Sequence, residues 1–272
     1  MATDLPQSVA GEPVLEVQPL LGGGQHNRCL LLRTAAARFV WRERLDTGDR
    51  PGASARQELR CHLAAASLGI APAVIDAATD GQWLLMAYVD APRWHADDLH
   101  DPGRLETLGR CLAQLHALSP QGVDRLDVRA IVEGQAALIR RRDPAATARV
   151  EALCVRALQL DAQIAALAVP AVLNHGDLAA ANLLGPEPRM VDWEYAQLAD
   201  PVYDIACLLS YYPEIETQVD RLLASSGLDD ARSRASLALH RQLFEVFNRL
   251  WAEAQGASHG DPAGIVLRPS AE

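Results

Sequence analysis

One polar loop between two short apolar segments limits the possible folds of this chain more than any other feature. Residues 171–173 (Ala-Val-Leu) and 190–191 (Met-Val) are predicted to be short buried strands. Between them lies the sequence His-Gly-Asp-Leu-Ala-Ala-Ala-Asn at 175–182, and Asp192 follows the second strand directly. A polar loop held between two buried strands places its side chains at one edge of a core, where a site can form.

Three oxygen-bearing side chains of this segment are expected to converge on one point. Asp177 and Asn182 lie five residues apart on the loop, and Asp192 lies at the end of the second strand. Mg²⁺ prefers oxygen ligands, with one or two carboxylates completed by substrate phosphates. A carboxylate that does not bind the metal can accept a proton from an attacking hydroxyl. The pattern therefore indicates metal-assisted transfer chemistry.

Composition excludes several classes of protein. The 272 residues are 49% hydrophobic and 22% charged, as in a globular protein with a sizeable core. The net charge is −10, and the densest basic run, 140–142 (Arg-Arg-Arg), is interpreted as the solvated side of a helix, so no nucleic-acid partner is expected. All 25 basic residues are arginine, which rules out chemistry that needs a lysine amine.

Compartment and membrane association are predicted from what the sequence lacks. The five cysteines are widely spaced without a Cys-x-x-Cys motif, which argues against zinc ribbons and thioredoxin-like sites and fits a reducing compartment. The first residues lack the basic start and apolar run of a signal peptide. No apolar stretch reaches 18 residues, so we expect a cytoplasmic protein without a membrane partner.

The chain is predicted to divide into two parts near residue 90. The first part has alternating strand patterns around one helix at about 53–68, whose apolar face is expected to carry Leu59, Leu63 and Ala66 and which ends at Gly69. The strands are expected at 14–20, 29–32, 39–42, 73–75 and 83–89. We therefore assign 1–90 to an N-terminal lobe.

Helical patterns dominate from residue 91 to residue 272. Asp101-Pro102 is a typical helix start, and leucines recur at helical spacing over 105–115. A second apolar stripe covers 153–167, and further helices are expected from about residue 202 and over 231–255. This region is predicted to be a helical lobe that carries the polar loop.

The polar loop and Asp192 resemble the catalytic loop and metal-binding aspartate of kinases. Gly176 stands where protein kinases have arginine, and Trp193-Glu194 follows Asp192 in place of Phe-Gly. This combination resembles the aminoglycoside phosphotransferase and choline kinase family, which includes choline, ethanolamine and thiamine kinases, over about 14–254. The resemblance implies an α+β, protein-kinase-like fold of two lobes, with a small antiparallel sheet and one main helix followed by a mostly helical lobe.

The same resemblance implies ATP and Mg²⁺ as cofactors and gives the loop residues their roles. Asp177 would be the catalytic base, and Asn182 and Asp192 would bind the metal. His175 is interpreted as a group that orients the loop. Asp204, within Asp-Pro-Val-Tyr-Asp at 200–204, is favoured as the acidic residue that bonds back to the catalytic loop.

The N-terminal residues that would bind the nucleotide occur in the order that this family implies. Arg42 stands on the third strand, where kinases usually have a lysine, and its planar guanidinium can bind two phosphate oxygens at once. Glu58 on the next helix would orient Arg42, although an exposed helical acid is the plain alternative. Glu43 and Arg44 are expected to be solvated.

Two further segments are expected to contact the nucleotide. The loop Gly22-Gly23-Gly24, which continues to Asn27, would cover the phosphates, although a simple hairpin turn explains these glycines equally well. Met86 and Tyr88 belong to the strand that leads into the hinge, where the backbone of 87–89 would meet the adenine edge. An ordinary core strand would also explain the sequence of this segment.

The acceptor is expected to be a small alcohol. A proline-led helix begins about nine residues after Asp192, which leaves no room for the activation segment of a protein kinase. Aromatic and acidic residues after Asp192 suit a cationic molecule, and the candidates are Trp193, Glu194, Tyr211 and Glu214. Thiamine, choline or ethanolamine is the leading group, with thiamine narrowly first.

Two alternatives remain open at this point. An aminoglycoside or amino-sugar kinase would need a wider and more acidic acceptor cleft. A catalytically silent nucleotide-binding module would have no chemical need for Asp177, Asn182 and Asp192 together. The sequence is neutral on the oligomeric state and on the choice between ATP and GTP.

Overall fold

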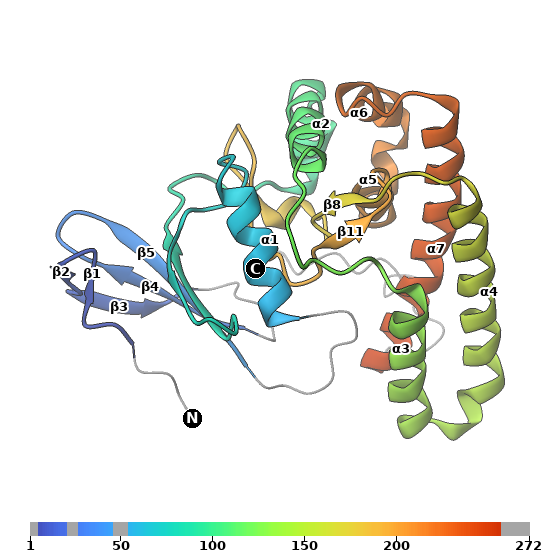
Figure 1. Cartoon of the computed structure of the whole chain (residues 1–272), viewed down its shortest axis with the longest axis horizontal. Coiled ribbons are helices and arrows are strands. Elements are labelled where there is room, and N and C mark those ends of the chain that lie inside the picture. Colours follow the sequence, from blue (N-terminus) through green and yellow to red (C-terminus); the bar gives the residue numbers. More distant parts are fainter. Residues whose placement is uncertain (1–4, 21–26, 46–53, 257–272) are drawn as a thin grey trace.

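The structure of the chain is a computed structural model that describes residues 5–20, 27–45 and 54–256. A sheet-rich part and a helical part follow one another along the chain (Figure 1). The α+β, protein-kinase-like fold that the sequence analysis expects is confirmed: an antiparallel sheet with one helix precedes a helical region.

Five antiparallel strands form the main sheet in the order β3-β4-β5-β7-β6. Their bounds are β3 Glu16–Pro19, β4 Asn27–Arg33, β5 Arg38–Arg44, β6 Val74–Ala77 and β7 Trp83–Ala87. The register places Cys29 opposite Arg42, and Arg42 opposite Leu84. Residues that lie directly opposite one another on neighbouring strands point to the same face of the sheet, so these three residues share one face.

A short hairpin covers the opposite face of the sheet, and the sequence analysis did not predict it. Its strands are β1 Ser8–Val9 and β2 Glu12–Pro13. Val9 packs there in a small core with Leu32, Phe39, Trp41 and Leu85. Two-residue strands give no recognisable alternation, so this element has no periodic signal in the sequence.

Helix α1 (Ala55–Ala66) lies beside the sheet (Figure 1), begins at the N-cap Ser54 and stops before Gly69, which has a φ of +71°. Its position was predicted, but its buried face was not. Leu63 is 47% exposed, whereas Glu58 is 2% and His62 3% exposed. The helix turns this polar side inward because it faces the charged groups on β5, so its apolar residues are a poor guide to its orientation.

The helical part contains two cores. The helices are α2 Pro102–His116, α3 Val128–Arg142, α4 Thr147–Ala166, α5 Tyr203–Tyr211, α6 Val219–Ser225 and α7 Ala231–Gln255. One core involves α2, α5 and α6, and the other is formed by α3, α4 and α7 (Figure 1). Asp101 caps α2 by accepting hydrogen bonds from the backbone amides of Gly103 and Arg104.

Two small strand pairs lie within the helical part and frame the polar loop. β8 Val172–Asn174 pairs with β11 Gln197–Ala199, and β9 Leu183–Leu184 pairs with β10 Arg189–Met190. The loop therefore leaves β8, passes through a single 3₁₀ turn at Ala180–Asn182, and enters β9. Asp192 follows β10, so both polar segments come to the same place.

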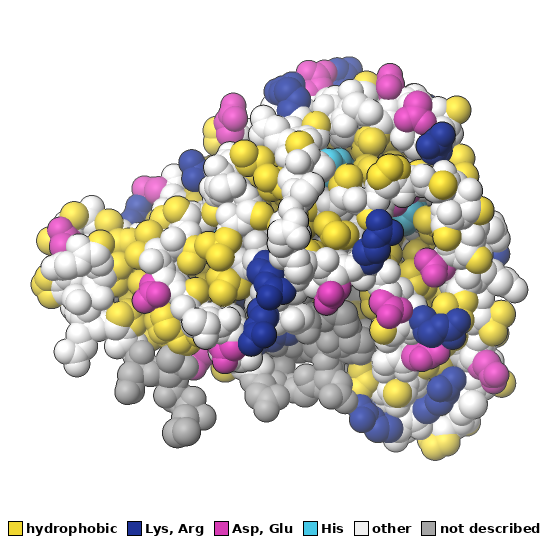
Figure 2. All heavy atoms as spheres, in the orientation of Figure 1, with side chains coloured by type: hydrophobic (Ala, Val, Ile, Leu, Met, Phe, Trp, Pro, Cys, Tyr) yellow, Lys and Arg dark blue, Asp and Glu magenta, His cyan; other side chains and the backbone are white. Residues whose placement is uncertain are grey.

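The surface of the described residues carries mixed charge. On the face shown in Figure 2, arginines alternate with acidic side chains and are not collected into one field. None of the described helices is long and apolar enough to span a bilayer.

Candidate active site

Gly176 fixes the backbone at the start of the polar loop. Its φ is +85°, and a Cβ atom built there would lie 2.0 Å from the carbonyl oxygen of Tyr195. No L-residue with a side chain fits this conformation and this close approach together. The glycine that distinguishes this loop from that of protein kinases is thus required by local packing.

Asp177 is half-buried and has a hydrogen-bond donor on each carboxylate oxygen. The Tyr211 hydroxyl donates to Oδ1 at 2.7 Å, and the Asn182 amide donates to Oδ2 at 3.3 Å and to the Asp177 carbonyl at 3.0 Å. Burial raises the pKa of Asp177 above its ordinary value, and the Tyr211 hydrogen bond opposes that rise. A carboxylate with a raised pKa accepts a proton more readily.

His175 and Asp204 support the loop from behind. The two Asp204 carboxylate oxygens accept hydrogen bonds from the backbone amides of His175, at 2.8 Å, and Gly176, at 2.9 Å. The His175 ring bonds to the Val191 carbonyl at 2.9 Å and so links the loop to the segment that carries Asp192. These contacts are of the kind that the sequence analysis expects for both residues.

Asp192 lies across the cleft from β5. Its φ of +67° is rare for a residue with a side chain and marks a strained position of the kind found at functional sites. Its carboxylate Oδ1 lies 2.7 Å from the guanidinium of Arg42, and its side chain is 36% exposed. Asp192 therefore contacts the sheet and still keeps part of its side chain exposed to solvent.

Arg42 is the centre of a charged cluster. Its guanidinium pairs with Glu58 on α1, as the sequence analysis expects, and also approaches Glu194 at 3.7 Å. Arg44 pairs with Glu58 at 3.4 Å, and Glu43 is 8% exposed and pairs with Arg28. The expectation that Glu43 and Arg44 are solvated is therefore wrong.

The strand alternation that places Arg42 inward places Arg44 on the same face, and this signal was present in the sequence. Arg44 is thus a residue of the charged cluster that the sequence reasoning missed.

Asn27 and Glu194 form a second link between the two parts of the chain. The Asn27 amide donates to Glu194 Oε2 at 3.4 Å, and both side chains are buried. Glu194 was expected to bind the acceptor, and the structure places its carboxylate between Arg42 and Asn27. The predicted phosphate-covering glycines, Gly22, Gly23 and Gly24, lie outside the described residues.

Met86 and Tyr88 lie at the end of β7. Met86 is buried opposite Val40. The Tyr88 amide donates to the Arg38 carbonyl at 3.1 Å, and the Arg38 guanidinium lies 4.4 Å from the centre of the Tyr88 ring.

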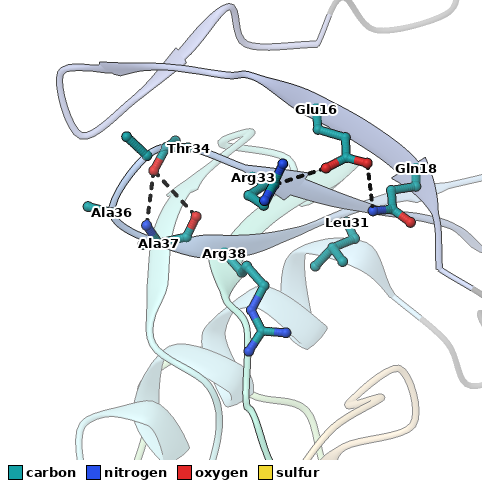
Figure 3. Close-up of a pocket in the computed structure, with 9 residues that line it drawn as sticks. Glu16, Gln18, Leu31, Arg33, Thr34, Ala36, Ala37 and Arg38 are labelled. Carbon is teal, nitrogen blue, oxygen red and sulfur yellow. Dashed lines mark hydrogen bonds and ion pairs between the residues drawn. The ribbon is translucent and has the colours of Figure 1, made fainter.

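Arg38 also pairs with Asp90 and, with Arg33 and Leu31, lines a hollow of about 500 Å³ against β3–β5 (Figure 3). The guanidinium of Arg38 thus holds the ring of Tyr88, and Tyr88 lines a second hollow together with Ala87 and Val89.

The remaining acceptor candidates have different environments. Trp193 is fully buried, and its ring nitrogen donates to the Met190 carbonyl while its ring packs against His175. A side chain in the core cannot line an open acceptor site, so the prediction for Trp193 is wrong. Glu214 is exposed in the turn after α5, and Tyr211 contacts Asp177.

The residues at the site fit an Mg²⁺ ion that also binds phosphates. The Asn182 amide directs its NH₂ group to Asp177, which leaves its carbonyl oxygen as the atom that could bind a metal. Among the described residues, no group of three or more His, Cys, Asp or Glu side chains could hold a metal. A metal at Asn182 and Asp192 would therefore take its other ligands from phosphates and water.

Solved structures share the fold over almost the whole chain. A choline/ethanolamine kinase family protein from Mesorhizobium loti has a TM-score of 0.71 at 20% identity, covering 96% of this chain and 88% of its own. Choline kinase LicA from Streptococcus pneumoniae has a TM-score of 0.73 at 19% identity, covering 94% and 92%. A spectinomycin phosphotransferase in complex with ADP and spectinomycin has a TM-score of 0.62 at 12% identity, covering 94% and 88%.

The family assignment comes from the sequence itself. No curated protein matches the chain significantly. The model of the phosphotransferase enzyme family, abbreviated APH, matches residues 17–240, which include the charged cluster, the polar loop and helix α5. This chain therefore belongs to the APH phosphotransferase family and is a small-molecule kinase.

Proposed function

We propose that this kinase transfers the γ-phosphoryl group of ATP to the hydroxyl of a small cationic alcohol, with thiamine first and choline or ethanolamine next. Phosphoryl transfer is supported by the arrangement of the site. The oxygen-bearing side chains of Asp177, Asn182 and Asp192 lie on one side, and the Arg42–Glu58 ion pair lies opposite them. This arrangement pairs a proton acceptor with oxygen ligands on one side of a cleft and a cation for phosphates on the other.

The chemistry follows from what each side chain can do. The Asp177 carboxylate accepts the proton of the acceptor hydroxyl as its oxygen attacks the γ-phosphorus, and the bond to the β–γ bridging oxygen breaks to release ADP. Arg42, oriented by Glu58, binds phosphate oxygens of the nucleotide through its planar N–H groups. Neutralisation of phosphate charge is what Mg²⁺, held by Asn182 and Asp192, would supply.

The preference for a cationic acceptor is supported by the negative charge of the chain. The chain carries a net charge of −10, which favours the approach of cations. The exposed Glu214 lies in the turn that follows α5, three residues after Tyr211, whose hydroxyl contacts Asp177. A carboxylate in that turn suits a cationic ammonium or thiazolium ion.

The test measures ADP release with ATP, Mg²⁺ and a panel of acceptors. The panel contains thiamine, choline, ethanolamine, an aminoglycoside and the neutral alcohol glycerol, and Asp177→Asn, whose turnover should be about 10²- to 10⁴-fold lower, serves as the reference. We expect the three small cations to be phosphorylated faster than glycerol. Equal rates with glycerol would refute the cationic class, and a faster rate with the aminoglycoside would shift the assignment to that group. Absence of any acceptor-dependent ADP release would refute the proposed reaction.

A further inference from the structure

Helix α5 contacts the catalytic loop at both of its ends. In its first turn, Asp204 accepts hydrogen bonds from the backbone amides of His175 and Gly176. At its last residue, the Tyr211 hydroxyl donates to Asp177 Oδ1 at 2.7 Å. Tyr211 follows Asp204 by seven positions, which is about two helical turns, so both side chains lie on the same face. The helix thus runs along the loop as a rigid support.

The hydrogen bond from Tyr211 completes the fixation of the Asp177 carboxylate. Asn182 donates to Oδ2 at 3.3 Å, so the two oxygens are held by donors from two different elements. Together these donors set the rotation of the carboxylate about its last bond. A carboxylate oxygen has two lone-pair directions, so Oδ1 keeps one for a further donor while the tyrosine occupies the other.

The surroundings keep the phenol of Tyr211 in its donating form. Burial raises the pKa of Tyr211 well above its ordinary value, and the charge of Asp177 acts in the same direction. The next residue, Tyr212, also holds the loop, because its hydroxyl accepts a hydrogen bond from the Ala180 amide at 3.2 Å. The two rings meet edge to face with centres 6.4 Å apart, which limits the movement of Tyr211.

We propose that Tyr211 is a positioning residue, which holds the Asp177 carboxylate in the orientation that receives the proton of the acceptor hydroxyl. The sequence analysis gave Tyr211 the different role of binding the acceptor. The inference rests on the proposed function, since it assumes that Asp177 is the base. It adds that the last residue of α5 acts on turnover through Asp177 and not through the affinity for either substrate.

The test compares Tyr211→Phe with a matched control on the same helix. Tyr203→Phe also removes a phenolic hydroxyl, one that bonds to Gln197 and lies in the core beside Phe244. For Tyr211→Phe we expect kcat to fall about 10- to 100-fold, because small errors in the placement of a reacting group are costly. The KM values for ATP and for the acceptor should stay within about twofold. Tyr203→Phe should keep kcat within about twofold.

A double mutant separates this inference from the proposed function. If Tyr211 acts through Asp177, adding Tyr211→Phe to Asp177→Asn should lower kcat by less than about twofold further. Normal turnover in Asp177→Asn alone would instead refute the base assignment in the proposed function.

Three results would overturn the positioning role while leaving the kinase assignment intact. The first is an unchanged kcat in Tyr211→Phe. The second is a raised KM for the acceptor at unchanged kcat, which would make Tyr211 an acceptor contact. The third is an equal loss of kcat in Tyr203→Phe and Tyr211→Phe, which would indicate a general effect on α5; thermal unfolding of both variants would show it as a shared loss of stability.

Discussion

At the scale of single residues, the guanidinium of Arg42 has a role that lysine cannot reproduce. It contacts Glu58, Asp192 and Glu194 at once through N–H groups that are spread over a planar fork, a geometry that the compact ammonium of lysine does not have. We expect Arg42→Lys to raise the KM for ATP by about 10-fold, because a compact ammonium cannot bind two phosphate oxygens in a fork. Steady-state kinetics at varied ATP would measure this change.

Arg44→Lys is the control for that variant. Arg44 lies on the same strand and face and pairs with Glu58 at 3.4 Å. Its replacement should change the KM for ATP by less than about threefold, since that ion pair is within the reach of an ammonium group. Equal effects of the two substitutions would mean that Arg42 does not bind the phosphates.

The strained backbone of Asp192 determines how its role can be tested. Asparagine tolerates a positive φ better than alanine does, so Asp192→Asn removes the negative charge with the least disturbance of the backbone. We expect the Mg²⁺ concentration for half-maximal activity to rise about 10-fold or more, because a neutral oxygen is a weaker ligand than a carboxylate. Calorimetric titration of nucleotide with and without Mg²⁺ should show the same loss of metal dependence. An unchanged Mg²⁺ response would place the metal elsewhere.

At the scale of elements, strong periodicity and turn residues predicted most of the structure. The main strands, α1, α2 and the long last helix occupy the regions that the sequence indicates. The β1–β2 hairpin was missed because each strand has only two residues. The buried face of α1 was assigned wrongly because its inner side is polar, with Glu58 and His62 facing the charged cluster and the helical part.

The turn at Gly176 allows a test of how the loop holds its shape. Gly176→Ala meets both a positive φ and a carbonyl oxygen 2.0 Å from the new Cβ, whereas Gly69→Ala meets a positive φ of +71° with nothing within 4 Å. We expect Gly69→Ala to cost about 1–2 kcal/mol of unfolding free energy. Gly176→Ala should cost about 1–3 kcal/mol more because the loop must also move.

Urea denaturation of both variants would give these values, and Gly176→Ala should in addition lower kcat. Equal destabilisation would show that the contact with Tyr195 relaxes freely.

At the scale of the whole molecule, the site exists only where the two parts of the chain meet. Arg42 and Asp192 are 150 positions apart, and Asn27 and Glu194 are 167 apart, yet each pair is in contact. Motif order and the family resemblance named candidate residues in both parts of the chain. They could not show that Trp193 and Glu194, which follow Asp192 in sequence, are buried, because burial is decided by packing between distant segments.

His62 lies at this meeting point and makes the junction sensitive to acid. It belongs to α1, bonds to the Pro72 carbonyl at 2.8 Å, and packs against Trp193 of the helical part. Burial lowers the pKa of His62 from 6.5 to about 4, and burial lowers that of His116, whose Nε2 has no partner within the described residues, to about 4 as well. Both histidines are thus neutral in the folded protein at pH 7.

Acid lowers the stability of the folded protein because the unfolded chain binds protons on these histidines at a higher pH than the folded protein does. As the pH falls below about 6.5, the unfolded chain takes up a proton on each histidine, while the folded protein does so only near pH 4. Stability contributed by the neutral histidines is therefore present at neutral pH and lost between about pH 6.5 and 4, by up to about 3 kcal/mol for His62. Buried Asp204, whose pKa is raised by burial, acts in the opposite direction over the acid range.

A difference between variants isolates the contribution of His62 from those of the other groups. Glutamine at this position keeps an N–H donor for the Pro72 carbonyl but cannot be protonated. We expect His62→Gln to lower stability at pH 7 yet to lose less stability than the wild type between pH 6.5 and 4.5, measured by urea denaturation at each pH. His100→Gln, at an exposed position, should follow the wild-type profile. If His62→Gln kept the full pH dependence, acid sensitivity would arise elsewhere than at His62, since this substitution removes the imidazole that packs against Trp193 at the junction.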